Sequence, residues 1–400
     1  MPQSPTHAHR PGLSTDTLDW TLVQAQQLVK HQQVIQIEAT TPIEEACMVL
    51  IENGISSAPI YDPATHTYVG MFDYRDIISF LLLVLDRSPS ETRASLEIKS
   101  LIRNASLLRQ VPVQMAADLS TQNPFYAIVP ETTLSHVVAI FGYGTHRMAV
   151  VDERGHIEGI LSQSTVNQYL HQNLEKFPQL HQLTLRSLQD LKLAETSVYT
   201  VPANSLVLDA MKAMVDLSVT SLAVVDNEEN AGLLGNISLT DIKYIMKKRR
   251  HELLWATCLD LIRHARLEQG LEDGQDRATV FSVTPSTTLQ HCIALLAATR
   301  AHRLWVTGGH SNSATTTISV AQPTAPAASP VKRGLSPLNP GSGSDSKSNL
   351  SGTTSGPSSL PSHMRHPSSG GVTAPFINSG RVIGVVSLTD ILRVITPSDD

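Results

Sequence analysis

Two histidine–arginine pairs are the residues with the most specific chemistry in this 400-residue chain. His146 precedes Arg147 and His302 precedes Arg303, each directly before a run of apolar residues. A guanidinium group is planar and permanently charged, and it can donate two parallel hydrogen bonds to a phosphate. The pairs predict phosphate binding. The alternative is that both histidines are partly buried structural residues.

Three aspartates stand at matching places, each at the start of an apolar helical segment: Asp76, Asp241 and Asp390. An aspartate at a helix start commonly caps the helix, which stabilises it by about 1 kcal/mol. The same end of a helix also favours bound anions. Both a capping and a ligand-binding interpretation are therefore open, and Ser387 and Thr389 would support a site at Asp390.

The segments that carry these residues form a fourfold internal repeat. Each copy has an apolar helix, two short apolar runs and a closing helix, an organisation that outranks any single motif. The spacing is similar in Pro42–Asp76, Pro130–Thr165 and Pro202–Asp241, and about three times longer in Pro285–Asp390. The fourth copy is therefore predicted to contain an insertion, residues 308–379.

Each copy has the pattern of a β-α-β-β-α unit. Apolar residues recur every three or four positions from Ile43 to Ile51, which predicts a helix with one buried face. Thr41 and Glu44 are predicted to form a capping box, and Gly54 to end the helix in the left-handed conformation. A three-stranded sheet with two helices on one face cannot close its own core, so the copies must pair.

This repeat resembles the cystathionine β-synthase (CBS) domain, whose pairs form Bateman modules that bind adenine nucleotides in many proteins. The resemblance implies an α/β (α+β) fold in which four CBS units form two Bateman modules in a flat, pseudo-symmetric assembly. The predicted boundaries are CBS 1 at 31–87, CBS 2 at 111–172, CBS 3 at 194–249, and CBS 4 at 276–307 plus 380–397, after a disordered tail at 1–19.

Among four-CBS proteins the chain resembles the fungal Sds/Moc-type regulators, through Phe72–Asp76, Phe80–Leu85, Val201–Ser205, Leu233–Ser238, Gly270–Gly274 and His302–Trp305. This resemblance implies a non-catalytic regulator of type 2A-like protein phosphatase or kinase signalling. The processes would be the cell cycle and nutrient stress, in cytoplasm and nucleus. The alternative is a γ subunit of an AMP-activated (SNF-type) protein kinase, and a third possibility is a sensor of S-adenosyl compounds.

The resemblance also implies roles for the residues above. The aspartates would accept the ribose hydroxyls of AMP, ADP or ATP, a regulatory ligand rather than a required cofactor, and the histidine–arginine pairs would face phosphates near the centre. Thr165 replaces the aspartate in the second copy, and Ser56 and Ser57 stand where γ subunits place a basic residue. We therefore expect fewer or weaker nucleotide sites than in a γ subunit.

Composition argues against several classes of protein. The net charge is −6 with no basic run, so nucleic-acid binding is not expected. The three cysteines lack metal-ligand spacing, which argues against a metal site and favours a reducing compartment. No apolar stretch approaches the roughly 20 residues of a membrane span, and no catalytic motif is present.

The insertion is rich in Ser, Thr, Pro and Gly and is predicted to be disordered. Ser329 lies in a Ser-Pro-Val-Lys sequence of the kind that proline-directed kinases recognise, and Ser336 precedes a second proline. A phosphate would add roughly −1.5 to −2 charge near the fourth copy. The alternative is an unmodified linker.

Overall fold

The structure of the chain is a computed structural model. All residues that it describes belong to one compact unit, Met1–Val320 with Ile377–Asp400. The described ranges are 19–85, 110–117, 119, 125–226, 232–273, 280–308, 315–317 and 380–397.

The first repeat has the predicted β-α-β-β-α order. Its elements are β1 (Ile37–Glu38), α2 (Ile43–Glu52), β2 (Ser57–Asp62), β3 (Thr67–Asp73) and α3 (Tyr74–Val84). Strand β1 pairs parallel with β2, and β2 pairs antiparallel with β3. Gly54 has a φ of 62° after α2, as predicted. The predicted capping box is wrong, because Pro42 is the N-cap of α2 and makes no side-chain cap hydrogen bond.

The second repeat follows the short helix η2 (Val113–Met115). Its elements are β4 (Ala127–Ile128), α5 (Leu134–Gly142), β5 (Arg147–Val151), β6 (Ile157–Ser162) and α6 (Gln163–Asn173). Two short helices, η3 (Leu174–Lys176) and α7 (Pro178–Thr184), lead to the third repeat. Near the N-terminus, η1 (Trp20–Leu22) and α1 (Ala25–Val29) form structure that the sequence did not predict, and α1 packs against β6.

The third repeat has the same order with a broken closing helix. Its elements are β7 (Val198–Pro202), α8 (Val207–Asp216), β8 (Ser221–Val225), β9 (Leu233–Ser238), η4 (Leu239–Asp241) and α9 (Ile242–Met246). Helices η5 (His251–Trp255) and α10 (Cys258–Asp273) connect it to the fourth repeat.

The fourth repeat is completed by residues on both sides of the predicted insertion. Its elements are β10 (Ser282–Val283), α11 (Leu289–Thr299), β11 (Arg303–Gly308), β13 (Arg381–Ser387) and α12 (Leu388–Ile395). Strands β11 and β13 are antiparallel neighbours. Within the insertion, β12 (Thr315–Thr317) pairs parallel with β7. Ser329 and Ser336 lie outside the described residues.

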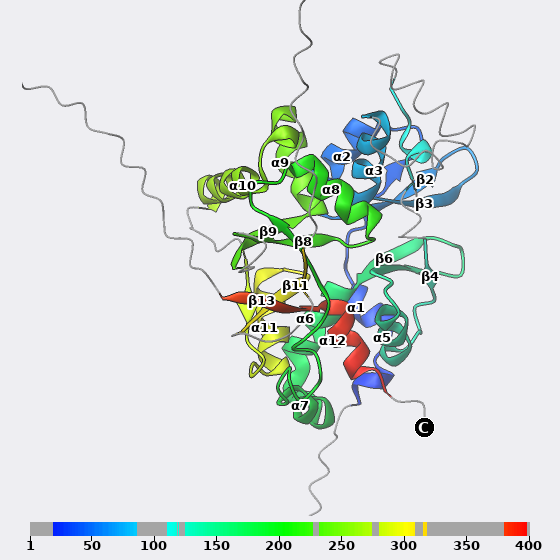
Figure 1. The fold of residues 1–400 in the computed structure, drawn as a ribbon. Helices are drawn as coiled ribbons and strands as arrows, with labels where there is room; N and C mark the ends of the chain where they lie inside the picture. The colour runs from blue at the N-terminus through cyan, green and yellow to red at the C-terminus, as the bar shows by residue number, and fades with distance from the viewer. Residues whose placement is uncertain are drawn as a thin grey trace, which may run out of the picture. The chain divides into compact units, whose positions relative to one another are not determined.

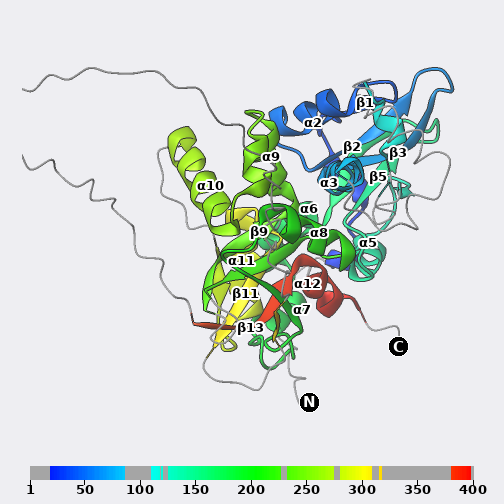
Figure 2. The ribbon, with the colours of Figure 1, turned by 45° about the horizontal axis from the view of Figure 1, so that its top comes forward.

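Helix faces join repeats that are not adjacent in sequence. The first and third repeats share one buried core, in which α3 packs against α8 (Figure 2). The second and fourth repeats share another core, in which α12 lies beside α5 (Figure 1) and α11 packs against α6. The repeats therefore do pair to close their cores, as the sequence predicted.

Sheet faces make a second kind of contact, between consecutive repeats. Val225 of the third repeat and Trp305 and Val382 of the fourth repeat belong to one buried cluster. Figure 1 shows the green strands β8 and β9 facing the yellow and red strands β11 and β13. Between the first repeat and the segment that opens the second, Tyr68 and Phe125 stack with ring centroids 5.7 Å apart. Together, these contacts bring equivalent ends of all four repeats to one place.

Candidate functional site

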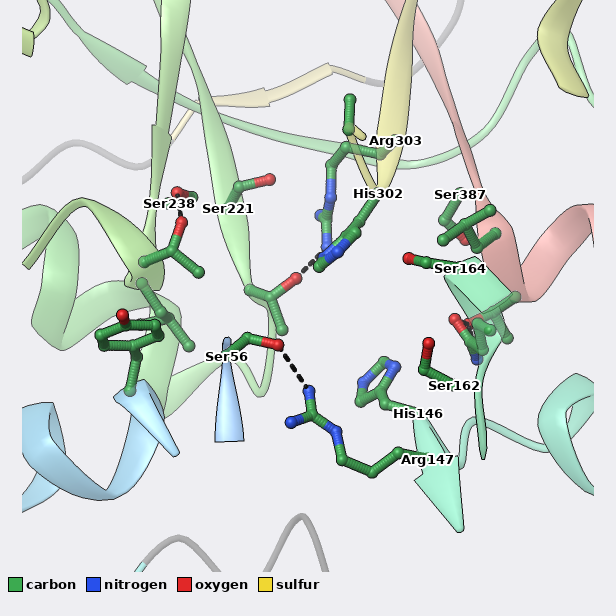
Figure 3. Close-up of a pocket in the computed structure, with 18 of the residues that line it drawn as sticks. Ser56, His146, Arg147, Ser162, Ser164, Ser221, Ser238, His302, Arg303 and Ser387 are labelled. Atoms are coloured by element: carbon green, nitrogen blue, oxygen red, sulfur yellow. Dashed lines mark hydrogen bonds between the residues drawn. The ribbon is translucent and has the colours of Figure 1, made fainter. Parts of the chain in front are cut away.

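A cavity of about 810 Å³ is lined by residues of all four repeats (Figure 3). Its size lies within the range of roughly 300–1,000 Å³ that is usual for small-molecule sites. Most of the labelled side chains in Figure 3 are hydroxyl, imidazole or guanidinium groups. Apolar and aromatic residues such as Phe281 and Trp305 also line it, so the cavity is equipped to bind a ligand with both polar and apolar parts.

The closing helix of every repeat begins at this cavity. The residues before the first helical turns are Asp73, Ser162, Ser238 and Ser387, and all four line it. In each repeat the last strand runs directly into the closing helix, so the place of the strand end fixes the place of the helix start. Helix N-termini carry partial positive charge, which favours a bound anion.

Both predicted histidine–arginine pairs line the same cavity. Figure 3 shows Arg147 and Arg303 extending into it from opposite sides, with His146 and His302 near them. Each arginine reaches from its own repeat to the preceding one. Arg147 donates to Ser57 and, over 3.2 Å, to the Ser56 hydroxyl, while Arg303 donates to Thr220. The serines that replace a basic residue in the first repeat thus hold an arginine of the second.

The charges of these residues act on one another. Desolvation by the surrounding protein lowers the pKa of His302 to about 4, and the charges of Arg147 and Arg303 add to this effect, while the exposure of the residue to solvent in the cavity moderates it. Burial also lowers the pKa of Arg303 to about 10, with Asp390 opposing and Arg75 increasing that shift. Both effects disfavour further positive charge in the cavity, so an anion bound there would be stabilised.

Burial lowers the pKa of His146 as well, and the charges of Arg147, Arg303 and Arg75 contribute, whereas a hydrogen bond with Gln163 opposes the shift. Both histidines are therefore neutral at pH 7 in the absence of a ligand. A neutral imidazole can accept or donate a hydrogen bond, and it can take up a proton when a phosphate binds beside it.

The three aspartates that the sequence marked as ribose ligands do not line this cavity; each acts as a cap. Asp76 accepts the Asp73 N–H over 3.1 Å and is 1% exposed. Asp241 accepts the Ser238 N–H over 2.7 Å, and burial raises its pKa. Asp390 accepts from the N–H of Ser387 over 2.9 Å.

Asp390 differs from the other two because its second oxygen, Oδ1, faces Arg393 at 3.7 Å and its side chain is 27% exposed. Ser387 and Thr389, the predicted supporting residues, do line the cavity. Thr389 accepts a hydrogen bond from the buried Gln163 over 3.0 Å, which ties the fourth repeat to the second. The ribose role of Asp390 stays a prediction.

Arg75 is the cavity residue that the sequence analysis missed. It is the second residue of α3, lines the cavity and is 7% exposed. A cation at the start of a helix is unfavourable because it opposes the helix dipole. That mismatch is a signal in the sequence that could have pointed to Arg75.

Three further features can be judged in the described part of the chain: a metal site, a membrane-spanning helix and reactive cysteines. Among those residues, no group of three or more His, Cys, Asp or Glu side chains could hold a metal ion. Within the same ranges, no helix is both long and apolar enough to cross a membrane. The three cysteines are buried and unpaired, and burial raises the pKa of each thiol to about 12.

Comparisons with known proteins agree with this architecture. The CBS domain family model matches residues 27–83, 116–172 and 189–248, and the structure supplies the fourth copy. The crystal structure of protein MJ1225 from Methanocaldococcus jannaschii, described as a candidate archaeal homologue of γ-AMPK, has a TM-score of 0.57 and 13% identity. That match covers 93% of this chain and 99% of the other, and it shows a shared fold.

Relatives in sequence are more specific. The chain is 32% identical over 394 residues to Protein SDS23 of Vanderwaltozyma polyspora, with 96% of this chain and 69% of that protein covered. It is 34% identical over 379 residues to Protein sds23 of Aspergillus niger, with 94% and 72% covered. These matches extend far beyond a single CBS domain. The chain belongs to the SDS23 family of CBS-domain proteins.

Proposed function

We propose that this chain is a non-catalytic regulatory protein that binds a phosphate-bearing ligand, an adenine nucleotide, in the central cavity. The observation that carries the proposal is the convergence of the starts of α3, α6 and α12 with Arg147 and Arg303 on one cavity of about 810 Å³. A guanidinium fork and helix N-terminal N–H groups are the two kinds of donor that most often bind phosphate oxygens.

The bound nucleotide has two parts, which different residues contact in this proposal. Its phosphoryl groups lie among His146, Arg147, His302 and Arg303, next to the helix starts. Its ribose approaches Asp390 at the edge of the cavity, next to the lining residues Ser387 and Thr389, because the Oδ1 of Asp390 does not take part in the capping box. Asp76 is 1% exposed and presents almost no surface to a ligand in this conformation. We therefore propose fewer nucleotide sites than there are repeats.

Ligand binding in this cavity would act on the arrangement of the repeats. Arg147 joins the second repeat to the first, and Arg303 joins the fourth to the third. A ligand that binds one arrangement stabilises it by about 2.7 kcal/mol when its concentration is 100 times its Kd. That free energy is large enough to change which surfaces are presented to a protein partner.

The partner that we propose is a type 2A-like protein phosphatase or a kinase complex, in cell-cycle and nutrient-stress signalling in the cytoplasm and nucleus. The phosphatase arm rests on the resemblance to the fungal Sds/Moc-type regulators, with which membership of the SDS23 family agrees. The two histidine–arginine pairs in one cavity support the second candidate, a γ subunit of an AMP-activated protein kinase. Phosphorylation of Ser329 or Ser336 would regulate these contacts by adding negative charge near the fourth repeat.

Purification of the tagged protein from its own cells, with and without added ADP, tests this function. We expect phosphatase components to be recovered in amounts that change with ADP, as identified by mass spectrometry. Recovery of kinase catalytic and scaffold subunits in equal amounts with the chain would instead identify it as a γ subunit. If neither class is recovered under either condition, the proposed partners are wrong.

A further inference from the structure

We propose that Arg75 is a third phosphate-binding arginine of the central cavity and that the ligand therefore carries two or more linked phosphoryl groups. This inference rests on the proposed function, because it assigns a ligand class to the same site. It adds a residue of the first repeat to the arginines of the second and fourth repeats.

The position of Arg75 is unusual for a structural arginine. Its side chain is more than nine-tenths buried, yet it lines the cavity. Its Nη1 is buried and makes no hydrogen bond within the part of the chain that the structure describes. Leaving a buried charged donor without a partner is costly. Because Nη1 has almost no accessible surface, a ligand oxygen in the cavity would supply the missing acceptor after a rotation of the guanidinium group, whose side chain lines the cavity.

The local sequence does not require an arginine here. The start of α3 is already capped by Asp73, which accepts the N–H of Arg75 over 2.7 Å and that of Asp76 over 3.2 Å. The two carboxylates attract the Arg75 charge, while burial lowers its pKa. The helix start is therefore formed without the guanidinium group, which also opposes the helix dipole.

Arg75 acts in the same space as the other cations. Besides burial, its charge contributes to the lowered pKa of Arg303 and of His146. Arg75, Arg147 and Arg303 come from three different repeats, on α3, β5 and β11. A residue of the first repeat thus supplies the positive charge that Ser56 and Ser57 do not.

The number of guanidinium groups indicates the class of ligand. A phosphate monoester carries roughly −1.5 to −2 charge at pH 7, whereas the three arginines together carry +3, which Asp73, Asp76 and Asp390 partly offset. The starts of α3, α6 and α12 add further positive potential. A diphosphate or triphosphate matches this charge better, and the cavity of about 810 Å³ has room for a chain of phosphoryl groups.

Calorimetric titration tests this inference with tripolyphosphate, pyrophosphate and orthophosphate, and then with ADP and AMP. We compare the wild-type protein with Arg75→Gln and with Arg263→Gln, a control at an exposed arginine of α10. We expect wild-type protein to bind tripolyphosphate at least tenfold more tightly than orthophosphate. We expect R75Q to lose about tenfold of the tripolyphosphate affinity, as for a lost charge-assisted hydrogen bond, and R263Q less than twofold.

Each outcome separates the inference from the proposed function. If wild-type protein binds tripolyphosphate and R75Q binds it equally well, Arg75 is not a ligand-binding residue, although the proposed function stands. Equal affinity of wild-type protein for orthophosphate and tripolyphosphate overturns the proposed ligand class. If no probe binds, the proposed function fails as well.

A second variant protects the test against misfolding. Arg75→Lys keeps the charge and loses the planar fork, so we expect a severalfold loss of tripolyphosphate affinity with an unchanged melting temperature. A purely structural role predicts the opposite: a lowered melting temperature of the ligand-free protein and no change in affinity once it is folded. Unchanged affinity of folded R75K overturns the proposed hydrogen bonds of Arg75.

Discussion

Replacing Arg303 with methionine should stabilise the ligand-free protein and abolish its response to the ligand. Methionine fills a similar volume without the charge. Arg303 is half-buried at the cavity, with Arg75 among the charges that act on it. If these arginines are present to bind an anion, the empty cavity is a place where folding is opposed by like charges. Removing one charge should then raise the free energy of unfolding and weaken ligand binding.

The magnitude follows from the pKa of Arg303, which is lowered from 12.5 to about 10. At about 1.4 kcal/mol per pH unit, the charged form costs at most roughly 3.5 kcal/mol in the folded protein. The folded-state pKa lies below the unfolded one, so the cost is fully present below pH 10 and is lost as the pH rises toward 12.5. The lost hydrogen bond to Thr220 offsets about 1.5 kcal/mol, which leaves a net gain of about 1–2 kcal/mol.

Thermal unfolding of the ligand-free proteins at pH 7 measures this gain. At roughly 2–3 °C per kcal/mol for a domain of this size, we expect Arg303→Met to raise the melting temperature by about 2–6 °C. Addition of ADP should raise the melting temperature of the wild type and leave that of R303M unchanged. Arg154→Met, at an exposed turn, is the control and should change neither value. A melting temperature of R303M below that of the wild type would refute the reasoning, because Arg303 would then be holding the fold together.

Three further predictions concern the cavity and its surroundings. The pKa of His302 is about 4 without a ligand, and a bound phosphate should raise it. Tripolyphosphate binding at pH 6 should therefore take up protons, and calorimetry in buffers of different ionisation enthalpy measures this uptake. His302→Gln should reduce the uptake. Asp390→Ala should weaken ADP severalfold in the same titrations and leave tripolyphosphate affinity unchanged; equal weakening of both would contradict a ribose contact. Burial raises the thiol pKa of all three cysteines, Cys47, Cys258 and Cys292, to about 12. None of them should therefore react with a disulfide reagent in the folded protein. Rapid reaction at pH 8 would contradict their burial.

The repeat and its elements could be predicted from the sequence because their signals are local. The periodicity from Ile43 to Ile51 and the glycine at position 54 specify a helix and its end without reference to the rest of the chain. The insertion was predicted from the long spacing of the fourth copy, and β11 and β13 pair across it as neighbouring strands of one repeat. By contrast, Thr41 does not cap α2, because Pro42 takes the N-cap position.

The sequence predicts that the repeats pair, but not which repeats pair through their helices. The first and closing helices all bury an apolar face, so their patterns do not say that α3 packs against α8 or α5 against α12. The candidate site depends on that pairing, because it brings the helix starts together. Arg147 and Arg303 were found from their motif, whereas Arg75 was missed because its role depends on a cavity that only the assembled repeats form.

A crystal structure of the protein grown with millimolar ADP tests the central claim most directly, because it locates the phosphoryl groups themselves. We predict two phosphoryl groups within hydrogen-bond distance of Arg147 and Arg303, beside the starts of the closing helices. A structure in which ADP is bound at another place on the chain while the central cavity holds only water would contradict the account.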